Sequence, residues 1–222
     1  MRSEQVSVSD LAAKPMWRDE ADIEPANAAP AMGRRPSFDR VSIGLHWATA
    51  LAVVAMFATA WLRPQSHDAH ARAMLLQIHR SLGVAIWTAS AFRLLWRQTK
   101  ATLPPFPAAM PNVQRSLVRL SECGLYALLL AQPLSGLGMS LLLGHPFPLF
   151  MMQVPQLLEE KTELWTAAYR VHDAGALALG ALAAGHAVAA LVHYFYIRDD
   201  ALQCMAPVIT TAPRPQTIPV RR

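Results

Sequence analysis

The chain contains several long apolar stretches, each with few or no charged residues and each long enough to cross a lipid bilayer. The first of these runs over residues 41–62 without a single charged side chain, and Arg40 and Arg63 stand at its two ends. A helix needs about 20 predominantly apolar residues to cross a hydrocarbon core of roughly 30 Å. This stretch therefore predicts a membrane-spanning helix.

A second span is predicted over residues 74–96, although it contains two charged residues, Arg80 and Arg93. A charged side chain inside a bilayer is costly, so each of these arginines should have a partner or reach an interface. Simple snorkelling of Arg80 toward the headgroups is an alternative to a specific role.

Two further spans are predicted over residues 117–143 and 171–197. Pro133 and nearby glycines interrupt the third span, which membrane helices tolerate and which favours close packing against a neighbour. Three consecutive aromatic residues near the end of the fourth span are typical of a membrane interface. The predicted fold class is all-α, an integral membrane four-helix bundle.

The segments outside the spans are polar, and they predict a simple organisation. Residues 1–40, mixed in charge and rich in Ala and Pro, predict a disordered tail, and residues 206–222 a second tail. Residues 41–205 form the predicted membrane domain. Basic residues near the span ends gather on the side of the N-terminus, which predicts that both termini are cytoplasmic.

The two longer loops are expected to differ in structure. The inner loop, residues 98–112, contains four prolines and should be extended. The outer loop, residues 144–170, is largely apolar, with three glutamates, and is expected to hold a short interfacial helix.

Composition supports a membrane protein and removes several other classes. Hydrophobic residues make up 53% of the 222, and charged residues 16%, against about 25% in soluble domains. The net charge is +5, and most of the basic residues lie outside the spans. This placement favours contact with an anionic membrane surface over binding of nucleic acid. With only Cys123 and Cys204, and no CxxCH motif, neither an iron–sulfur site nor thioether-linked haem is supported.

The histidines carry the candidate chemistry, because five of the eight lie within or at the ends of the predicted spans. A lone histidine in a membrane helix is usually a packing or hydrogen-bonding residue, whereas several at matched depths indicate bound ligands. His172 and His186 are 14 residues apart, which is about 21 Å along a helix and within about 40° of one face. One helix would thus present two ligands, one toward each membrane surface.

Because successive helices run in opposite directions, His172 and His186 should each have a histidine of another helix at the same depth. His46 lies early in the first span, hence in the inner half, with His186. His79 lies early in the second span, hence in the outer half, with His172. Two inward-facing histidines at one depth suit the two axial positions of a haem iron. His193, one heptad after His186, could replace it as a ligand, or could instead contact a haem propionate or a quinone oxygen.

Two arginines are candidates for binding haem propionates by charge-assisted hydrogen bonds. Arg93 is 14 residues after His79 and so returns to the same interior face at the inner depth. Arg80 is adjacent to His79 on the outer side.

In the order and spacing of these segments, the chain resembles the bacterial cytochrome b561 family, the four-helix di-haem membrane cytochromes. The matching stretches lie between residues 41 and 205 and read SIGLHWATALAV, QIHRSLGVAIWTASAFRLLWR, LAQPLSGLGMS and VHDAGALALGALAAGHAVAALVHYFYIRDDALQCM. The resemblance implies two non-covalently bound haem b groups, with ligands at the positions of His46, His79, His172 and His186. The long N-terminal tail departs from the family pattern.

The resemblance also implies electron transfer across the bacterial inner membrane, with quinone as the inner redox partner and an unidentified periplasmic donor. Superoxide is the outer donor in some members. The pattern overlaps with the cytochrome b subunits of nickel–iron hydrogenases, so the alternative is a haem-containing membrane anchor that relays electrons for a soluble redox enzyme. A haem-free proton or metal transporter using the same histidines is a third possibility.

Overall fold

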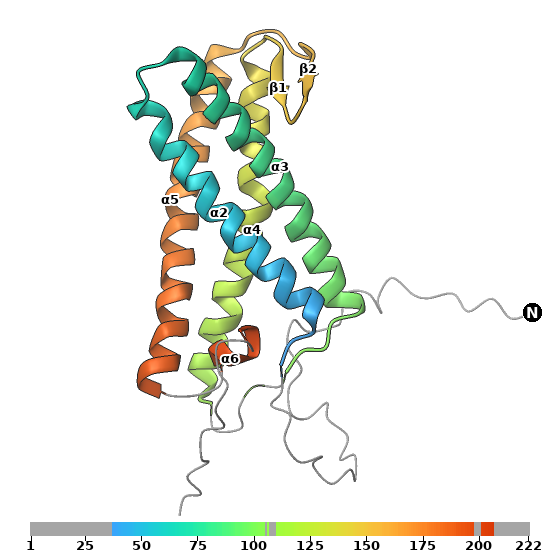
Figure 1. The fold of residues 1–222 in the computed structure, drawn as a ribbon, viewed down its shortest axis with the longest axis vertical. Helices are drawn as coiled ribbons and strands as arrows, with labels where there is room; N and C mark the ends of the chain where they lie inside the picture. Colours follow the sequence, from blue (N-terminus) through green and yellow to red (C-terminus); the bar gives the residue numbers. More distant parts are fainter. Residues whose placement is uncertain (1–36, 105, 107–109, 198–200, 207–222) are drawn as a thin grey trace, which may run out of the picture.

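Four long helices running side by side dominate the fold (Figure 1), and the structure, a computed structural model, describes residues 37–104, 106, 110–197 and 201–206. Most of the two predicted tails, residues 1–36 of 1–40 and residues 207–222 of 206–222, lies outside the described residues. The long helices are α2 (Arg40–Leu62), α3 (Ala69–Thr99), α4 (Asn112–Leu142) and α5 (Thr162–Val192). Each predicted span lies almost entirely within one of them, and α5 begins nine residues earlier than expected.

Short elements complete the described chain. They are the 3₁₀ turn η2 (Arg63–Gln65), the strands β1 (Phe147–Leu149) and β2 (Met152–Val154), the π-helical turn η3 (His193–Ile197) and the helix α6 (Ala201–Met205).

The start of α2 is set by Asp39, a residue that the sequence places in the tail. Its carboxylate accepts hydrogen bonds from the backbone N–H of Ser42 (3.0 Å), from the Ser42 hydroxyl (2.7 Å) and from Trp96 Nε1 (3.1 Å). Partial burial opposes ionisation, but these hydrogen bonds outweigh it and lower the pKa of Asp39. Asp39 therefore caps α2 and also joins it to the end of α3.

The helices pack in chain order. Helix α2 packs on α3, α3 on α4, and α4 on α5, whereas direct backbone contact between α2 and α5 is sparse among the described residues. A small apolar cluster fills the middle of the bundle, with Met56, Ile86, Leu129 and Leu179 as its buried members. Near this level the ring of Phe57 on α2 lies against Gly180 on α5.

Most large apolar side chains point outward, as expected for a protein surrounded by lipid. Leu51, Val54 and Leu177 are each about two-thirds exposed or more. Within the described residues, α2, α4 and α5 are long and apolar enough to cross a membrane by length and composition. Helix α3, which carries Arg80 and Arg93, is not among them, yet it packs between α2 and α4. The prediction of a helical membrane bundle is confirmed.

The outer loop differs from its prediction. Residues 144–161 contain no helix; they form an antiparallel hairpin of β1 and β2, in which Leu149 pairs with Met152. Prolines at positions 146, 148 and 155 explain the difference, because proline lacks the backbone N–H that a helix interior needs. The helical part of the predicted loop, residues 162–170, is the start of α5, so the expectation of a separate short interfacial helix was wrong.

Candidate functional site

The structure brings together the same two histidine pairs that the sequence predicts to face each other. His79 on α3 lies opposite His172 on α5, with ring centres 6.3 Å apart. His46 on α2 lies opposite His186 on α5, also with ring centres 6.3 Å apart. Helix α5 thus contributes one histidine to each pair.

Hydroxyl groups orient the rings of the outer pair. The Thr59 hydroxyl donates to the backbone carbonyl of Met56 (2.7 Å) and lies 3.2 Å from His79 Nδ1. The Ser135 hydroxyl donates to the carbonyl of Gln132 (2.8 Å) and lies 2.9 Å from His172 Nδ1.

This arrangement decides the tautomer of both outer histidines. The Met56 carbonyl also lies 3.2 Å from His79 Nδ1 and can only accept, so Nδ1 of His79 carries the proton. The Ser135 hydroxyl, with its single proton directed to the Gln132 carbonyl, accepts from His172 Nδ1. The proton then resides on Nδ1, and the lone pair on Nε2 is left for a metal. Such a hydrogen bond at the far nitrogen is typical of metal-bound histidine.

Close approach of α4 and α5 positions His172. A Cβ placed on Gly136 would lie 2.9 Å from His172 Cε1, so only glycine leaves room for the ring. One turn earlier, Gln132 Nε2 donates to the backbone carbonyl of His172 (2.8 Å), and the amide of Gln132 fills the space above Gly175.

The inner pair has a different environment, in which charge is more prominent. The ring of His46 is in edge contact with Trp47, whose Nε1 donates to the carbonyl of Met205 (2.9 Å). The Arg93 guanidinium is near enough to act electrostatically on both His46 and His186. The structure therefore places Arg93 at the inner pair, where the sequence predicts it.

Arg93 also lies beside a buried hydroxyl that lacks a partner. Its guanidinium carbon is 5.6 Å from the ring centre of Tyr126. Tyr126 is 8% exposed, and its hydroxyl makes no hydrogen bond to any of the described residues. A buried polar atom without a partner is costly, and a bound acidic group would satisfy it.

Arg80 lies next to the outer histidine pair, and its side chain is held by contacts within the protein. Its Nε donates to the Ser140 hydroxyl (3.0 Å), and its guanidinium carbon is 4.9 Å from the ring centre of Phe147. Its charge also acts on His79.

His193 is the first residue of η3, and its Nε2 lies 3.1 Å from Gln114 Nε2 on α4. The structure thus engages it with α4, while His186 faces His46. His67 and His145, which lie in loops, are exposed, and so is His70, which the sequence places in a loop and the structure places in the first turn of α3.

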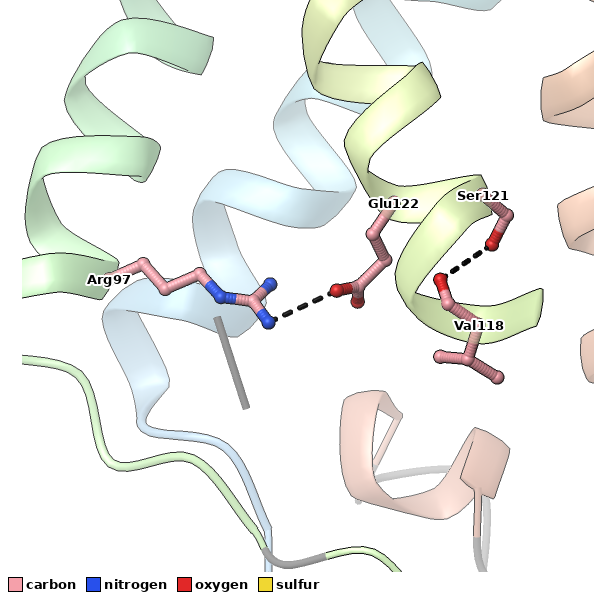
Figure 2. A network of polar contacts seen from close by, with 4 residues as sticks. All are labelled: Arg97, Val118, Ser121 and Glu122. Atoms are coloured by element: carbon pink, nitrogen blue, oxygen red, sulfur yellow. Dashed lines mark hydrogen bonds and ion pairs between the residues drawn. The ribbon is translucent and has the colours of Figure 1, made fainter. Parts of the chain in front are cut away.

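An ion pair joins α3 to α4 near the inner pair. Arg97 Nη2 lies 3.1 Å from Glu122 Oε2, and the two side chains are 6% and 16% exposed (Figure 2). Glu122 also acts electrostatically on Arg93. Sequence reasoning overlooked this glutamate, although an acidic residue inside a predicted span was itself the signal.

The residues present fit haem. A bond between a metal and an imidazole nitrogen is about 2 Å long. Two imidazoles on opposite sides of one metal ion therefore have ring centres about 6 Å apart, once the distance from nitrogen to ring centre is added on each side. Both histidine pairs have this separation. Among the described residues, no cluster of three or more His, Cys, Asp or Glu could hold a bare metal ion. Each pair offers two nitrogens, which suits a metal that a tetrapyrrole already holds by its other positions.

Comparison with known proteins decides the family. The family model of the prokaryotic cytochrome b561 matches residues 37–207. The chain belongs to the prokaryotic cytochrome b561 family. It is therefore a membrane cytochrome that binds haem b and has an electron-transfer role.

Curated relatives in the cytochrome b561 family support this assignment. The chain is 29% identical to Cytochrome b561 homolog 2 of Escherichia coli (strain K12), over 74% of this chain and 88% of the relative. It is 27% identical to Cytochrome b561 homolog 1 of the same organism, over 77% and 97%. It is 26% identical to the Probable superoxide oxidase CybB of Yersinia pestis, over 75% and 94%.

Proposed function

We propose that this cytochrome b561 holds two haem b groups and moves electrons across the bacterial inner membrane. The outer group is bound by His79 and His172, and the inner group by His46 and His186. The observation that carries the proposal is the presence of two facing histidine pairs, each with ring centres 6.3 Å apart. Each haem supplies one-electron redox chemistry, while the protein sets its ligands, charge and burial.

The surrounding residues have separate roles in the proposal. Thr59 and Ser135 hold the outer ligands in the tautomer that leaves Nε2 free. Arg93 and the Tyr126 hydroxyl bind a propionate of the inner group, and Arg80 binds one of the outer group. His193, near the inner end of α5, contacts a propionate or the quinone.

Quinone is the proposed inner redox partner. The outer donor is proposed to be superoxide, which the similarity to the superoxide oxidase relative supports. Oxidation of two superoxide ions to dioxygen releases two electrons, which with two protons reduce one quinone to its quinol. The basic residues Arg63, Arg72 and Arg170 near the outer ends of the helices would attract the anion.

The test is the haem-to-protein ratio of the purified chain, together with its reduced-minus-oxidised spectrum. We expect two haem b groups per chain, and one after His172→Ala, with the remaining spectrum assigned to the inner group. His145→Ala, in the exposed outer loop, is the matched control and should keep both. A ratio of one in the unmodified protein, or two in His172→Ala, would overturn the ligand assignment.

A further inference from the structure

The β1–β2 hairpin has an apolar tip that nothing in the described structure covers. Phe150 and Met151 form the turn between paired Leu149 and Met152. Phe150 is 49% exposed, Met152 75% and Met151 fully exposed. Residues 144–158 contain no Asp, Glu, Lys or Arg, so no charged side chain of the hairpin favours contact with water.

The backbone of this tip is bound to α3 by two side chains. Phe150 N–H donates to the Ser81 hydroxyl (2.7 Å), and Gln77 Nε2 donates to the Phe150 carbonyl (2.5 Å). Gln77 and Ser81 are one helical turn apart, so both lie on one face of α3. Together they satisfy both polar backbone groups of Phe150, as a site without access to water requires.

The conformation of Phe150 indicates that this anchoring is specific. Its φ is +52°, a left-handed conformation that is strained for a bulky residue and usually left to glycine in hairpin turns. A freely solvated turn would have little reason to keep a phenylalanine there. The paired hydrogen bonds from α3 hold the strained backbone in place, while the tip side chains stay about half exposed or more.

The attachment points give the depth of the tip. Gln77 and Ser81 bracket His79, which lies beside Thr59. Thr59 is four residues, about 6 Å, before Arg63, the first charged residue at this end of α2. At the same depth on α5, Asp173 is exposed beside His172. Charged side chains thus begin at this level, as is typical of the boundary between headgroups and acyl chains.

The hairpin also shapes an apolar groove at this level. A space of about 380 Å³ lies between Phe150 and the residues Met74, Ile78 and Leu82 of α3. Figure 1 shows the hairpin beside this part of α3. On the bundle side of the hairpin, Phe147 is 1% exposed and lies against Arg80, so the other end of β1 is fixed in the protein.

We propose that the β1–β2 hairpin is an interfacial re-entrant segment whose tip, residues 150–152, is seated among the lipid acyl chains at this end of the bundle. Its apolar side chains and the groove beneath Phe150 contact lipid, and Gln77 and Ser81 replace water as partners of the tip backbone. An interfacial segment of this kind gains stability by burying apolar surface at the headgroup boundary. The proposal goes beyond the electron-transfer function and does not depend on the haem ligands.

The first experiment measures where the tip lies in a membrane. In the full chain carrying Cys123→Ala and Cys204→Ala, Met151→Cys is spin-labelled and the protein reconstituted into phosphatidylcholine vesicles. Power saturation then compares relaxation by oxygen, which concentrates in lipid, with relaxation by a water-soluble nickel chelate. Leu177→Cys, on the lipid-facing side of α5, and Glu159→Cys, in the charged part of the loop, are the references.

We expect the ratio of oxygen to nickel accessibility at Met151 to exceed that at Glu159 several-fold and to approach that at Leu177. Equal ratios at Met151 and Glu159 would overturn the proposal. If Met151→Cys does not fold, Met152→Cys tests the same tip with the same two outcomes.

The second experiment removes an anchor. Ser81→Ala in the labelled Met151→Cys chain should raise its nickel accessibility, because the tip loses one of its two bonds to α3. Thr88→Ala is the matched control, since within the described part of the chain the Thr88 hydroxyl bonds only to the carbonyl of Val84 on its own helix. An equal effect of both changes, or no effect of Ser81→Ala, would contradict the anchoring role.

Discussion

Thr59 and Ser135 have small hydroxyl groups in otherwise apolar surroundings, and each acts on one histidine of the outer pair. Each hydroxyl donates its single proton to a carbonyl three residues earlier. Its oxygen is therefore left to accept a hydrogen bond from the histidine Nδ1. The sequence predicted the histidines but not these partners. A serine in a helix bonds to its own backbone by default, and only the position of a neighbouring helix shows that it has a second contact.

Replacing Ser135 by alanine should weaken the outer haem site while leaving the inner one unchanged. The substitution removes the acceptor of the His172 Nδ1 proton, and loss of such a partner typically costs about 10-fold or more in metal-site affinity. The measurement is haem content after detergent washing, with a redox titration of the two haem signals.

Ser121→Ala supplies the control for that experiment. Ser121 is also on α4, and its hydroxyl donates to the carbonyl of Val118, three residues earlier (2.9 Å), as Figure 2 shows. It should leave both haem signals unchanged. Equal behaviour of the two alanine variants would show that Ser135 does not act through His172.

At the scale of the elements, hydrophobic patterning predicted the four long helices because each must satisfy its own backbone in lipid. The hairpin was missed because the hydrogen bonds that hold its turn against α3 are not local, although β1 and β2 themselves pair locally. Residues 144–161 show neither a helical nor a strand period, and their partners, Gln77 and Ser81, are about 70 residues earlier in the chain. The pairing of the histidines, in contrast, could be predicted from helix direction and spacing alone.

The Arg97–Glu122 pair should be a main stabilising contact between α3 and α4. Glu122→Gln removes the charge that faces a buried arginine, and breaking such a pair costs about 3–5 kcal/mol. We expect a clearly lower melting temperature in detergent, measured by the loss of helical circular dichroism.

The matched change is Glu163→Gln, because Glu163 is an exposed glutamate in the first turn of α5. This variant should alter stability by no more than about 0.5 kcal/mol. A melting temperature of Glu122→Gln that equals that of Glu163→Gln would argue against a stabilising role of the buried pair.

At the scale of the whole molecule, the direction of the bundle in the membrane follows from charge. Basic residues near the helix ends are more frequent at the end where α2 begins and α3 ends, which predicts that this end is cytoplasmic. The outer and inner labels of the two histidine pairs depend on this orientation. The fold itself is the same whichever way it is inserted.

Fusion proteins test the orientation directly. Green fluorescent protein joined after Arg222 should fluoresce, because it folds in the cytoplasm, and alkaline phosphatase at the same position should be inactive. Alkaline phosphatase joined after Glu159, in the loop at the opposite end, is the control and should be active. The reverse pattern would invert the labels and place the His46–His186 pair on the periplasmic side.

The sparse contact between α2 and α5 has a consequence for how the protein matures. Because α2 is attached to the bundle through α3, all four helices can assemble in the bilayer before the two faces of α2 and α5 are joined. Haem held by His46 and His186 would link α2 directly to α5, and haem held by His79 and His172 would link α3 to α5. The bound prosthetic group would in this sense complete the fold, so we expect the haem-free chain to hold α2 less firmly against α5 than the loaded cytochrome does.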